Sequence, residues 1–341
     1  MAKVLFLIKR RNDGDNIVDR AGIFTGVNIT ADCISSKQHS SKVAVVNSSN
    51  SIQGEITLFD PTHVIIEGIW VEPDLLQSLI SENPNRKFCV RLHGDMDTLC
   101  STDHALPWLS SYNCTIACHN PIQLRELRTL MAFELKWTEK QAAEKILHLP
   151  SYHAVNIPKI VLDKDRKVLD AGSFNPLNSE GNHLLQASAA LRFANNSKMH
   201  LHFHVQLPQG ETGDNNSTLE NLQRLFHNVD SEDHLLVIHP WSPRSAWIEM
   251  CGLMDVGLAA SQHPAGDQNA ADMVSTGVPI VHSCATWGGS LWRADPTDSI
   301  DIAKKLSLAI ELRWVNVTWH EIKLWFYNRA AGKTWKKYIS S

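Results

Sequence analysis

The sequence predicts an α/β protein made of two Rossmann-like lobes. Short apolar runs rich in β-branched residues recur along the chain, and helix-like segments separate them. The runs are nearly continuous and do not alternate with polar residues, which indicates strands covered on both faces, as in parallel sheets. At 341 residues the chain is also longer than one compact core usually allows. We therefore expect two doubly wound lobes.

The first lobe is predicted to span residues 1–150. Its strands are expected at five apolar runs, and its helices at four segments between or after them. The strands are VLFLI (4–8), VAVV (43–46), HVIIEGIW (63–70), KFCVRLH (87–93) and CTIAC (114–118). The helices are residues 21–34, PDLLQSLISENP (73–84), ALPWLSSY (105–112) and PIQLRELRTLM (121–131). In the last of these the apolar residues have roughly helical spacing. This order predicts βαβ units and an open sheet.

The second lobe is predicted to span residues 151–312. The charged segment 135–149 is expected to be helical, and SYHAVNIPKIVLD to be an extended crossing between the lobes. A second alternation follows, with strands at 168–174, 200–207, 234–241, 255–261 and 278–283 and helices at 183–196, 217–229, 245–254 and 269–277. The tail 313–341 carries four tryptophans and is expected to be a helix that packs across both lobes.

Composition limits the partners and the compartment. The net charge of −4 and the pI near 6.5 disfavour binding of nucleic acid by bulk electrostatics. The apolar run at the start is about five residues, too short for a signal segment or a membrane span, so we expect no membrane partner. Seven scattered cysteines are typical of reduced thiols in the cytoplasm. Cys114 and Cys118 would lie about 13 Å apart on a strand, too far for a disulfide.

Several stretches resemble one family. FDPTHVIIEGIWVEPDLL, KFCVRLHGD, HNPIQLRELRTL, GNHLLQASAALRFA, VIHPW and MDVGLAAS…NAADMVSTGVPIV look like retaining glycosyltransferases of the GT-B fold, in particular a group common in large tailed phages. The resemblance implies a nucleotide-sugar donor bound mostly by the second lobe, and an acceptor brought by the first. Phage DNA with modified bases or a surface glycan is the implied acceptor, and the host cytoplasm the implied location. It implies no metal and no other cofactor.

The resemblance also assigns roles to residues. His93, at the end of the strand in RLHGD, matches the cleft histidine that contacts the donor sugar; a surface histidine at a strand end is the alternative. Asp272, five residues before Gly277, matches the acid that contacts the ribose. The backbone before it is expected to hold the diphosphate at a helix N-terminus, through Gly266, Asp267, Gln268 and Asn269. On the acceptor side, Arg10, Arg11 and Asn12 form a basic loop or a solvated charge run.

The donor site departs from the family pattern. Pro264 stands where the family has a first acid, and Asp267 adds a carboxylate beside the expected diphosphate. Asn175 and Asn178 stand where the family has an arginine and a lysine, and no cation occurs between Lys167 and Arg192. Placed donors of this kind are worth about 3 to 4 kcal/mol each in catalysis.

Three functions remain open. In an active glycosyltransferase with an altered donor site, Arg244, Arg293 or the cluster Lys9-Arg10-Arg11 would supply the missing charge. A non-catalytic GT-B scaffold in a phage particle or complex would not need it. A GT-B sugar-nucleotide epimerase would need the same cations, so their absence does not favour that function.

One further pattern in the second lobe has the spacing of a metal site. His200, His202 and His204 alternate in HLHFH, so a strand would place them on one face. Because alternation makes such a face without any metal, we expect none.

Overall fold

The computed structural model describes residues 1–10, 21–35, 39–47, 50–93, 114–155, 167–207, 216–229, 233–262, 267–283, 285, 287–288 and 290–341. Its chain divides into two compact units, the first comprising Met1–Tyr152 with Asn328–Ser341 and the second His153–Tyr327. Each unit is an α/β body built on one parallel sheet, which confirms the predicted fold class. The predicted helix 105–112, much of the crossing, and Arg11, Asn12, Pro264 and Gly266 lie outside the described residues.

The first unit is built on six parallel strands in the order β2-β1-β3-β4-β5-β6. They are β1 (Lys3–Lys9), β2 (Ser40–Val46), β3 (His63–Glu67), β4 (Lys87–Leu92), β5 (Thr115–Cys118) and β6 (Ile146–His148). All five residues of β3 are buried, as expected for a strand covered on both faces. The prediction of a helix over 135–149 is wrong for its last residues, which form β6. Residues 146–148 pair with β5, and Ile146 is fully buried.

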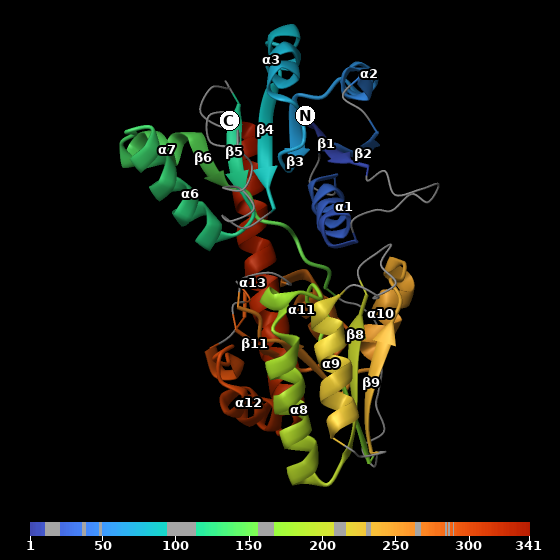
Figure 1. Cartoon of the computed structure of the whole chain (residues 1–341). Coiled ribbons are helices and arrows are strands. Elements are labelled where there is room, and N and C mark those ends of the chain that lie inside the picture. Colours follow the sequence, from blue (N-terminus) through green and yellow to red (C-terminus); the bar gives the residue numbers. More distant parts are fainter. Residues whose placement is uncertain are drawn as a thin grey trace. The chain divides into compact units, whose positions relative to one another are not determined.

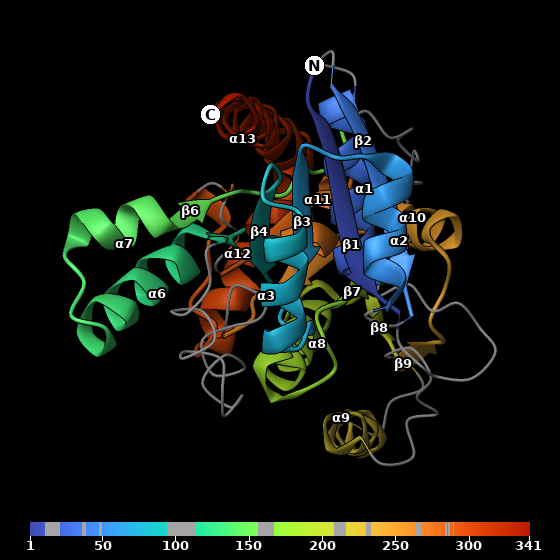
Figure 2. The same ribbon diagram turned by 90° about the horizontal axis from the view of Figure 1, so that it is seen from above.

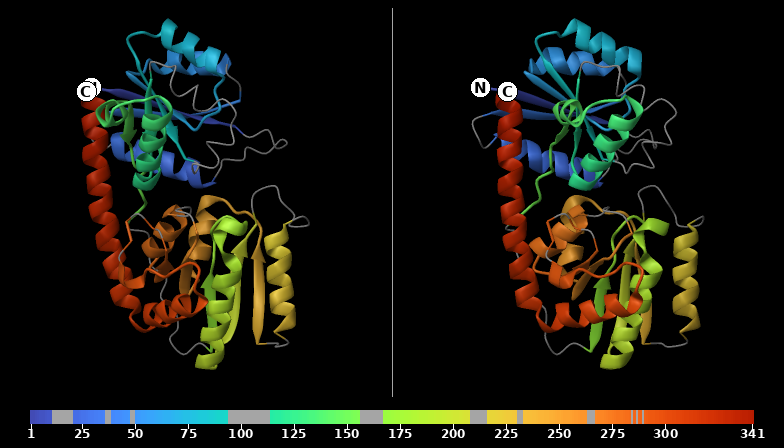
Figure 3. Two further views of the ribbon diagram at one scale, coloured as in Figure 1. Left: turned by 60° about the vertical axis from the view of Figure 1, so that its left-hand side comes forward. Right: turned by 90° about the vertical axis from the view of Figure 1, so that its left-hand side faces the viewer.

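Helices cover both faces of this sheet (Figure 3). Those of the described part are α1 (Ala21–Ser35), α2 (Asn50–Phe59), α3 (Pro73–Glu82), α6 (Pro121–Glu134) and α7 (Glu139–Lys145), together with the end of the C-terminal helix. α2, α3 and α6 pack on one face, while α1 and the C-terminal helix pack on the other. α6 and α7 lie side by side at the β6 edge (Figure 2). Asn120 caps α6, accepting a hydrogen bond from Ile122 N at 2.7 Å.

The second unit has five parallel strands in the order β11-β10-β7-β8-β9. They are β7 (Val168–Gly172), β8 (His200–Gln206), β9 (His234–His239), β10 (Val256–Ala259) and β11 (Ile280–His282). The chain winds outward from β7 to β9 and then returns to β10 on the other side of β7. The strand order therefore reverses between β7 and β10, where open α/β sheets bind ligands outside the carboxyl ends of their strands.

The helices of the second unit form two layers. They are α8 (His183–Ser197), α9 (Ser217–Asn228), α10 (Arg244–Gly252), α11 (Asp267–Ser275) and α12 (Ser299–Glu311). α8, α9 and α12 pack against one face of the sheet, with α8 and α9 in front in Figure 1. α10 and α11 pack against the other face around Phe174 and Met273.

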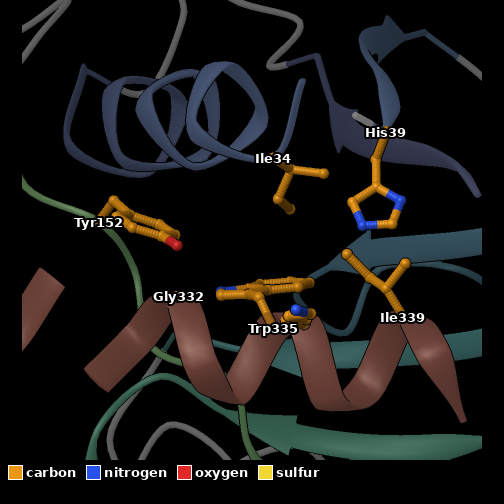
Figure 4. A pocket seen from close by; sticks show the side chains of 7 residues that line it. Ile34, His39, Tyr152, Gly332, Trp335 and Ile339 are labelled. Carbon is orange, nitrogen blue, oxygen red and sulfur yellow. The ribbon is translucent and has the colours of Figure 1, made fainter. Parts of the chain in front are cut away.

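The C-terminal helix α13 (Arg313–Ser340) contributes to the core of each unit. Leu324 is fully buried in the second unit, and Trp335 is buried in the first, where its indole donates to Pro150 O at 2.8 Å. Trp335 also lines a hollow of about 160 Å³ with Ile34 and Tyr152 (Figure 4). Residues 313–340 are thus helical and carry buried side chains. No helix in the described part of the chain is long and apolar enough to cross a membrane.

Two tryptophans of α13 test this packing. Trp335 is 1% exposed and packs against Phe6 with ring centroids 5.7 Å apart, whereas Trp314 is 74% exposed. Trp335→Ala should lower the free energy of unfolding by about 3 to 5 kcal/mol, because it leaves a cavity in the first core. Trp314→Ala is the control and should change it by less than about 0.5 kcal/mol. Urea denaturation measures both, and equal losses in the two variants would contradict this assignment of the helix.

Candidate functional site

A buried ion pair lies near the carboxyl ends of β3 and β4 in the first unit. Glu67 and Arg91 are register partners on these two strands, and the structure exposes neither side chain to solvent. Arg91 Nη1 donates to Glu67 Oε1 at 3.0 Å, and Nη2 donates to Ser151 Oγ. A carboxylate without solvent contact needs a charged partner, so Arg91 is what permits Glu67 at this position.

His93 is held by this ion pair. It follows β4, its side chain is 11% exposed, and its Nε2 donates to Glu67 Oε2. The other imidazoles at these strand ends are His119, whose ring stacks on that of His93 at 5.1 Å, and His148, which donates to His119 O at 3.2 Å. Burial lowers the pKa of His148, which keeps that ring neutral.

This arrangement fixes the orientation and the proton of His93. The hydrogen bond from Nε2–H to Glu67 sets which tautomer a neutral His93 ring adopts. Because Arg91 already neutralises the carboxylate, His93 sits beside a pair with no net charge. The site can thus present an oriented imidazole to a substrate. The sequence named His93 as a candidate and gave no role to Glu67 or Arg91. The available signal was a charged residue inside each of two apolar strand runs.

Asp272 is the centre of the polar cluster in the second unit. It lies in α11, is 1% exposed, and accepts four hydrogen bonds from three side chains. Arg244 donates through both Nη atoms, Trp247 Nε1 donates to Oδ2 at 2.8 Å, and Gln268 Nε2 donates to Oδ1 at 2.8 Å. A carboxylate has about four acceptor positions. All four are taken by the protein.

The cations proposed from the sequence lie in different surroundings. Arg244 makes a two-pronged ion pair with Asp272 and keeps 34% of its side chain exposed. Arg293 is exposed, and its backbone N donates to Ser290 O at 3.2 Å. Arg10 lies in the first unit, where its Nη1 donates to Asn47 Oδ1 at 3.3 Å. Asp272 thus neutralises the charge of Arg244, so this charge reaches a ligand only if the pair opens.

The start of α11 is tied to the turn after β7. Asp267 begins the helix, and Asn269 Nδ2 donates to Phe174 O, two residues beyond the end of β7. Gln268 links Asp272 to His153, whose Nδ1 donates to Gln268 Oε1 at 3.0 Å. Burial lowers the pKa of His153 to about 4, so it is neutral near pH 7. α11 therefore presents Asn269 and Gln268 in positions fixed by neighbouring groups.

The turn between β7 and α8 is polar but carries no cation. Asn175 is buried, and its Nδ2 has no hydrogen-bond partner within the described residues. Asn178 is exposed, and its Oδ1 accepts from Gly181 N at 3.0 Å. A side chain at Gly181 would meet Pro176 O at 2.2 Å, so the turn requires glycine there. The turn thus holds the buried amide of Asn175 and no arginine or lysine, and its one carboxylate is that of Glu180.

His183 at the start of α8 ties this turn to the sheet. Ser173 Oγ donates to His183 Nδ1 at 2.9 Å, and His183 Nε2 donates to Pro176 O at 3.0 Å. Burial lowers the pKa of His183 to about 4, which leaves the ring neutral near pH 7. The turn is therefore held by one hydrogen bond to an uncharged imidazole and one from it.

Comparisons with known proteins identify the fold. No family model and no curated protein sequence matches the chain. Sucrose-phosphate synthase from Thermosynechococcus elongatus aligns with a TM-score of 0.68 and 9% identity, covering 100% of this chain and 98% of that one. The catalytic domain of starch synthase IV from Arabidopsis thaliana, bound to ADP and acarbose, aligns at 0.67 and 8%, covering 100% of both. An α-glucosyltransferase in complex with UDP and a 13-mer DNA with a central A:G mismatch aligns at 0.65 and 8%, again over 100% of both.

The fold is of the GT-B type. The alignments run over whole chains, and these structural neighbours are nucleotide-sugar glycosyltransferases. At 8 to 9% identity the likeness shows the fold alone. The roles of individual residues have to come from the site.

The buried neutral histidines predict a loss of stability in acid. His153 and His183 have pKa values near 4 in the folded chain, against about 6.5 when unfolded. The unfolded chain therefore binds more protons between these values, and stability present above pH 6.5 falls as the pH drops towards 4. Each histidine should lower the free energy of unfolding by about 2 kcal/mol between pH 7 and pH 5.

Urea denaturation of the wild type and of His183→Gln at pH 7 and pH 5 checks this. The variant should lose less stability than the wild type over the same interval, whatever its stability at pH 7, because one titrating group is gone. If the variant and the wild type lose the same free energy of unfolding between pH 7 and pH 5, the assignment of a neutral buried His183 is contradicted.

Proposed function

We propose that the chain is a retaining glycosyltransferase that takes a sugar from a nucleotide-sugar donor and transfers it to an acceptor. The observation that carries this proposal is the His93–Glu67–Arg91 arrangement, a histidine oriented by a buried, neutralised carboxylate at the carboxyl end of a parallel strand. A surface histidine without a role does not require a buried ion pair beneath it. The GT-B fold supports the same activity.

The second unit takes the donor in this proposal. The strand order reverses between β7 and β10. Asn269 of α11 donates to Phe174 O just beyond the end of β7, Asn175 follows in the same turn, and Asp272 lies one turn further along α11. The ribose hydroxyls bind Asp272, and the diphosphate binds at the start of α11, where backbone amides and the helix dipole favour an anion. Gly266 and Asp267 contribute to this part by their backbone.

Donor binding then requires an exchange of partners at Asp272. All four acceptor positions of the carboxylate are taken, so a ribose hydroxyl can bind only if one internal donor leaves. Arg244 is the donor best placed to leave, because a third of its side chain is already in contact with water. Once released, its guanidinium supplies the cation that the turn after β7 lacks. Arg293 is the second candidate for that charge.

For the acceptor we propose phage DNA with a modified base, or a surface glycan, inside a phage-infected cell. The solved α-glucosyltransferase bound to UDP and DNA supports a DNA acceptor for this fold. On this chain Arg10, Arg11 and Asn12 are the proposed acceptor-side residues, since local positive charge favours DNA phosphates even when the net charge is −4.

A second function is a non-catalytic GT-B scaffold. Two observations favour it. The acceptor positions of Asp272 are all taken by the protein, and no arginine or lysine occurs between Lys167 and Arg192. A scaffold needs no donor, so it predicts no saturable binding of UDP or GDP up to millimolar concentration. The enzyme predicts saturable binding that is lost in Asp272→Ala.

Transfer activity tests the enzyme directly. The protein is incubated with a panel of nucleotide-sugars and either phage DNA or a glycan acceptor, and mass spectrometry detects a glycosylated product. His93→Ala should lower the rate by about 100-fold or more, because the oriented imidazole is lost. Glu67→Gln should lower it by about 10-fold or more, because His93 loses its charged partner and Arg91 is left without its counter-ion.

The exposed His227 on α9 provides the matched control. His227→Ala should leave the rate unchanged. If the wild type gives product and His93→Ala gives as much, the proposed role of His93 is wrong. If no combination of donor and acceptor gives product and no nucleotide binds, the chain is a scaffold.

A further inference from the structure

A second polar cluster lies on one face of the sheet in the second unit. Asp170 is in the middle of β7, and the cluster adds His202 and His204 from β8 and His239 from the end of β9. The intervening residues of β8, such as Phe203, point into the core under α8 and α9. Because side chains alternate along a strand, the histidines lie on the opposite face.

The cluster converges on one carboxylate oxygen. His202 Nδ1 lies 3.1 Å from Asp170 Oδ1, and His204 Nε2 lies 3.1 Å from the same atom. One ligand atom from each of the three residues can be chosen so that all lie within 4.8 Å of one another. A tetrahedral Zn²⁺ with bonds of about 2.0 to 2.1 Å places its ligand atoms about 3.3 Å apart. The three side chains are thus already near the spacing that an ion requires.

His239 supports His204 from the far side of its ring. His204 Nδ1 lies 2.8 Å from His239 Nε2, and the two rings stack with centroids 5.1 Å apart. A histidine that binds a metal through one nitrogen normally uses the other for a hydrogen bond that fixes its orientation. With an ion on His204 Nε2, the proton resides on Nδ1 and donates to His239. His239 is therefore a positioning residue.

We propose that Asp170, His202 and His204 form a binding site for a divalent transition-metal ion such as Zn²⁺. Two imidazoles and a carboxylate are ligands that suit Zn²⁺ or Fe²⁺ better than Mg²⁺. Three protein ligands leave a further coordination position, and the 33% exposure of the His202 side chain allows water to reach it. The proposal does not depend on the proposed transfer activity.

This site differs from the pattern considered in the sequence. There, the row His200, His202 and His204 was expected to bind no metal, because alternation alone explains it. The structure separates His200 from the cluster, since its Nδ1 pairs with Asp233 at 3.0 Å. It adds Asp170 from the neighbouring strand, directly opposite His202 in the register. The ligand set therefore comes from two strands.

A hydrogen-bonded network without metal is the competing explanation. The buried carboxylate of Asp170 needs partners, and the N–H groups of His202 and His204 satisfy it at the same 3.1 Å. The two explanations differ in whether the purified protein takes up an ion at these residues.

Metal titration of the full chain decides between them. After treatment with a chelator, the protein is dialysed against Zn²⁺, Co²⁺ or Mg²⁺, and bound metal is measured by mass spectrometry. We expect one Zn²⁺ or Co²⁺ per chain at micromolar concentration and no Mg²⁺. His202→Ala and His204→Ala should abolish this uptake, and His239→Phe should weaken it by about 10-fold. His200→Ala is the matched control, from the same strand face, and should bind as the wild type does.

The visible spectrum of bound Co²⁺ gives a readout that needs no variant. It should show the intense bands of a four-coordinate ion without thiolate charge transfer, since the proposed ligands include no cysteine. Absence of stoichiometric uptake by the wild type would overturn the proposal, as would a cysteine-type spectrum. Equal loss of binding in His200→Ala and His204→Ala would also overturn it. Melting curves of each variant without metal establish that the comparison is made on folded protein.

Discussion

The carboxylate of Asp272 is the interaction on which the second unit depends. It lies in α11, away from water, and its partners Arg244 and Trp247 come from α10 while Gln268 comes from α11 itself. Breaking such a pair by removing one partner leaves an uncompensated buried charge, at a cost of about 3 to 5 kcal/mol when both groups are buried. The same contacts that hold α10 to α11 therefore oppose any ligand that needs this carboxylate.

The first unit also contains a buried carboxylate that an arginine neutralises, but there the carboxylate has a different set of partners. Glu67 is also a buried carboxylate paired with an arginine, but its second oxygen receives His93 at the strand end. The pair there fixes the orientation of the His93 imidazole. At Asp272 all acceptor positions of the carboxylate are taken, so a ligand can bind this group only if one of the present donors moves away.

The strands could be predicted from the sequence because a parallel sheet is buried on both faces. Its strands therefore appear in the sequence as continuous apolar runs, such as that of β3. β6 could not be predicted, since it has three residues after a charged helix and forms only by pairing with β5. For the sites, the sequence named His93, Asp272, Arg244 and Gln268 as candidates, but it did not indicate that Arg244 and Gln268 bind Asp272 or that Glu67 binds His93. Arg91 and Glu67 meet through strand register, and Arg244 reaches Asp272 from 28 residues away. Asp170 likewise joins His202 only through register, so neither pair has a local signature.

The central claim, that a nucleotide binds the second unit by taking a place on Asp272, is tested most directly at Trp247. Its indole N–H donates to Asp272 Oδ2, so its resonance in ¹⁵N-tryptophan spectra reports on that oxygen. Trp247→Phe identifies the resonance, and UDP or GDP is then titrated into the wild type. The account predicts that the Trp247 resonance shifts and saturates together with nucleotide binding. Saturable binding that leaves this resonance unmoved, or no binding up to millimolar nucleotide, would contradict it.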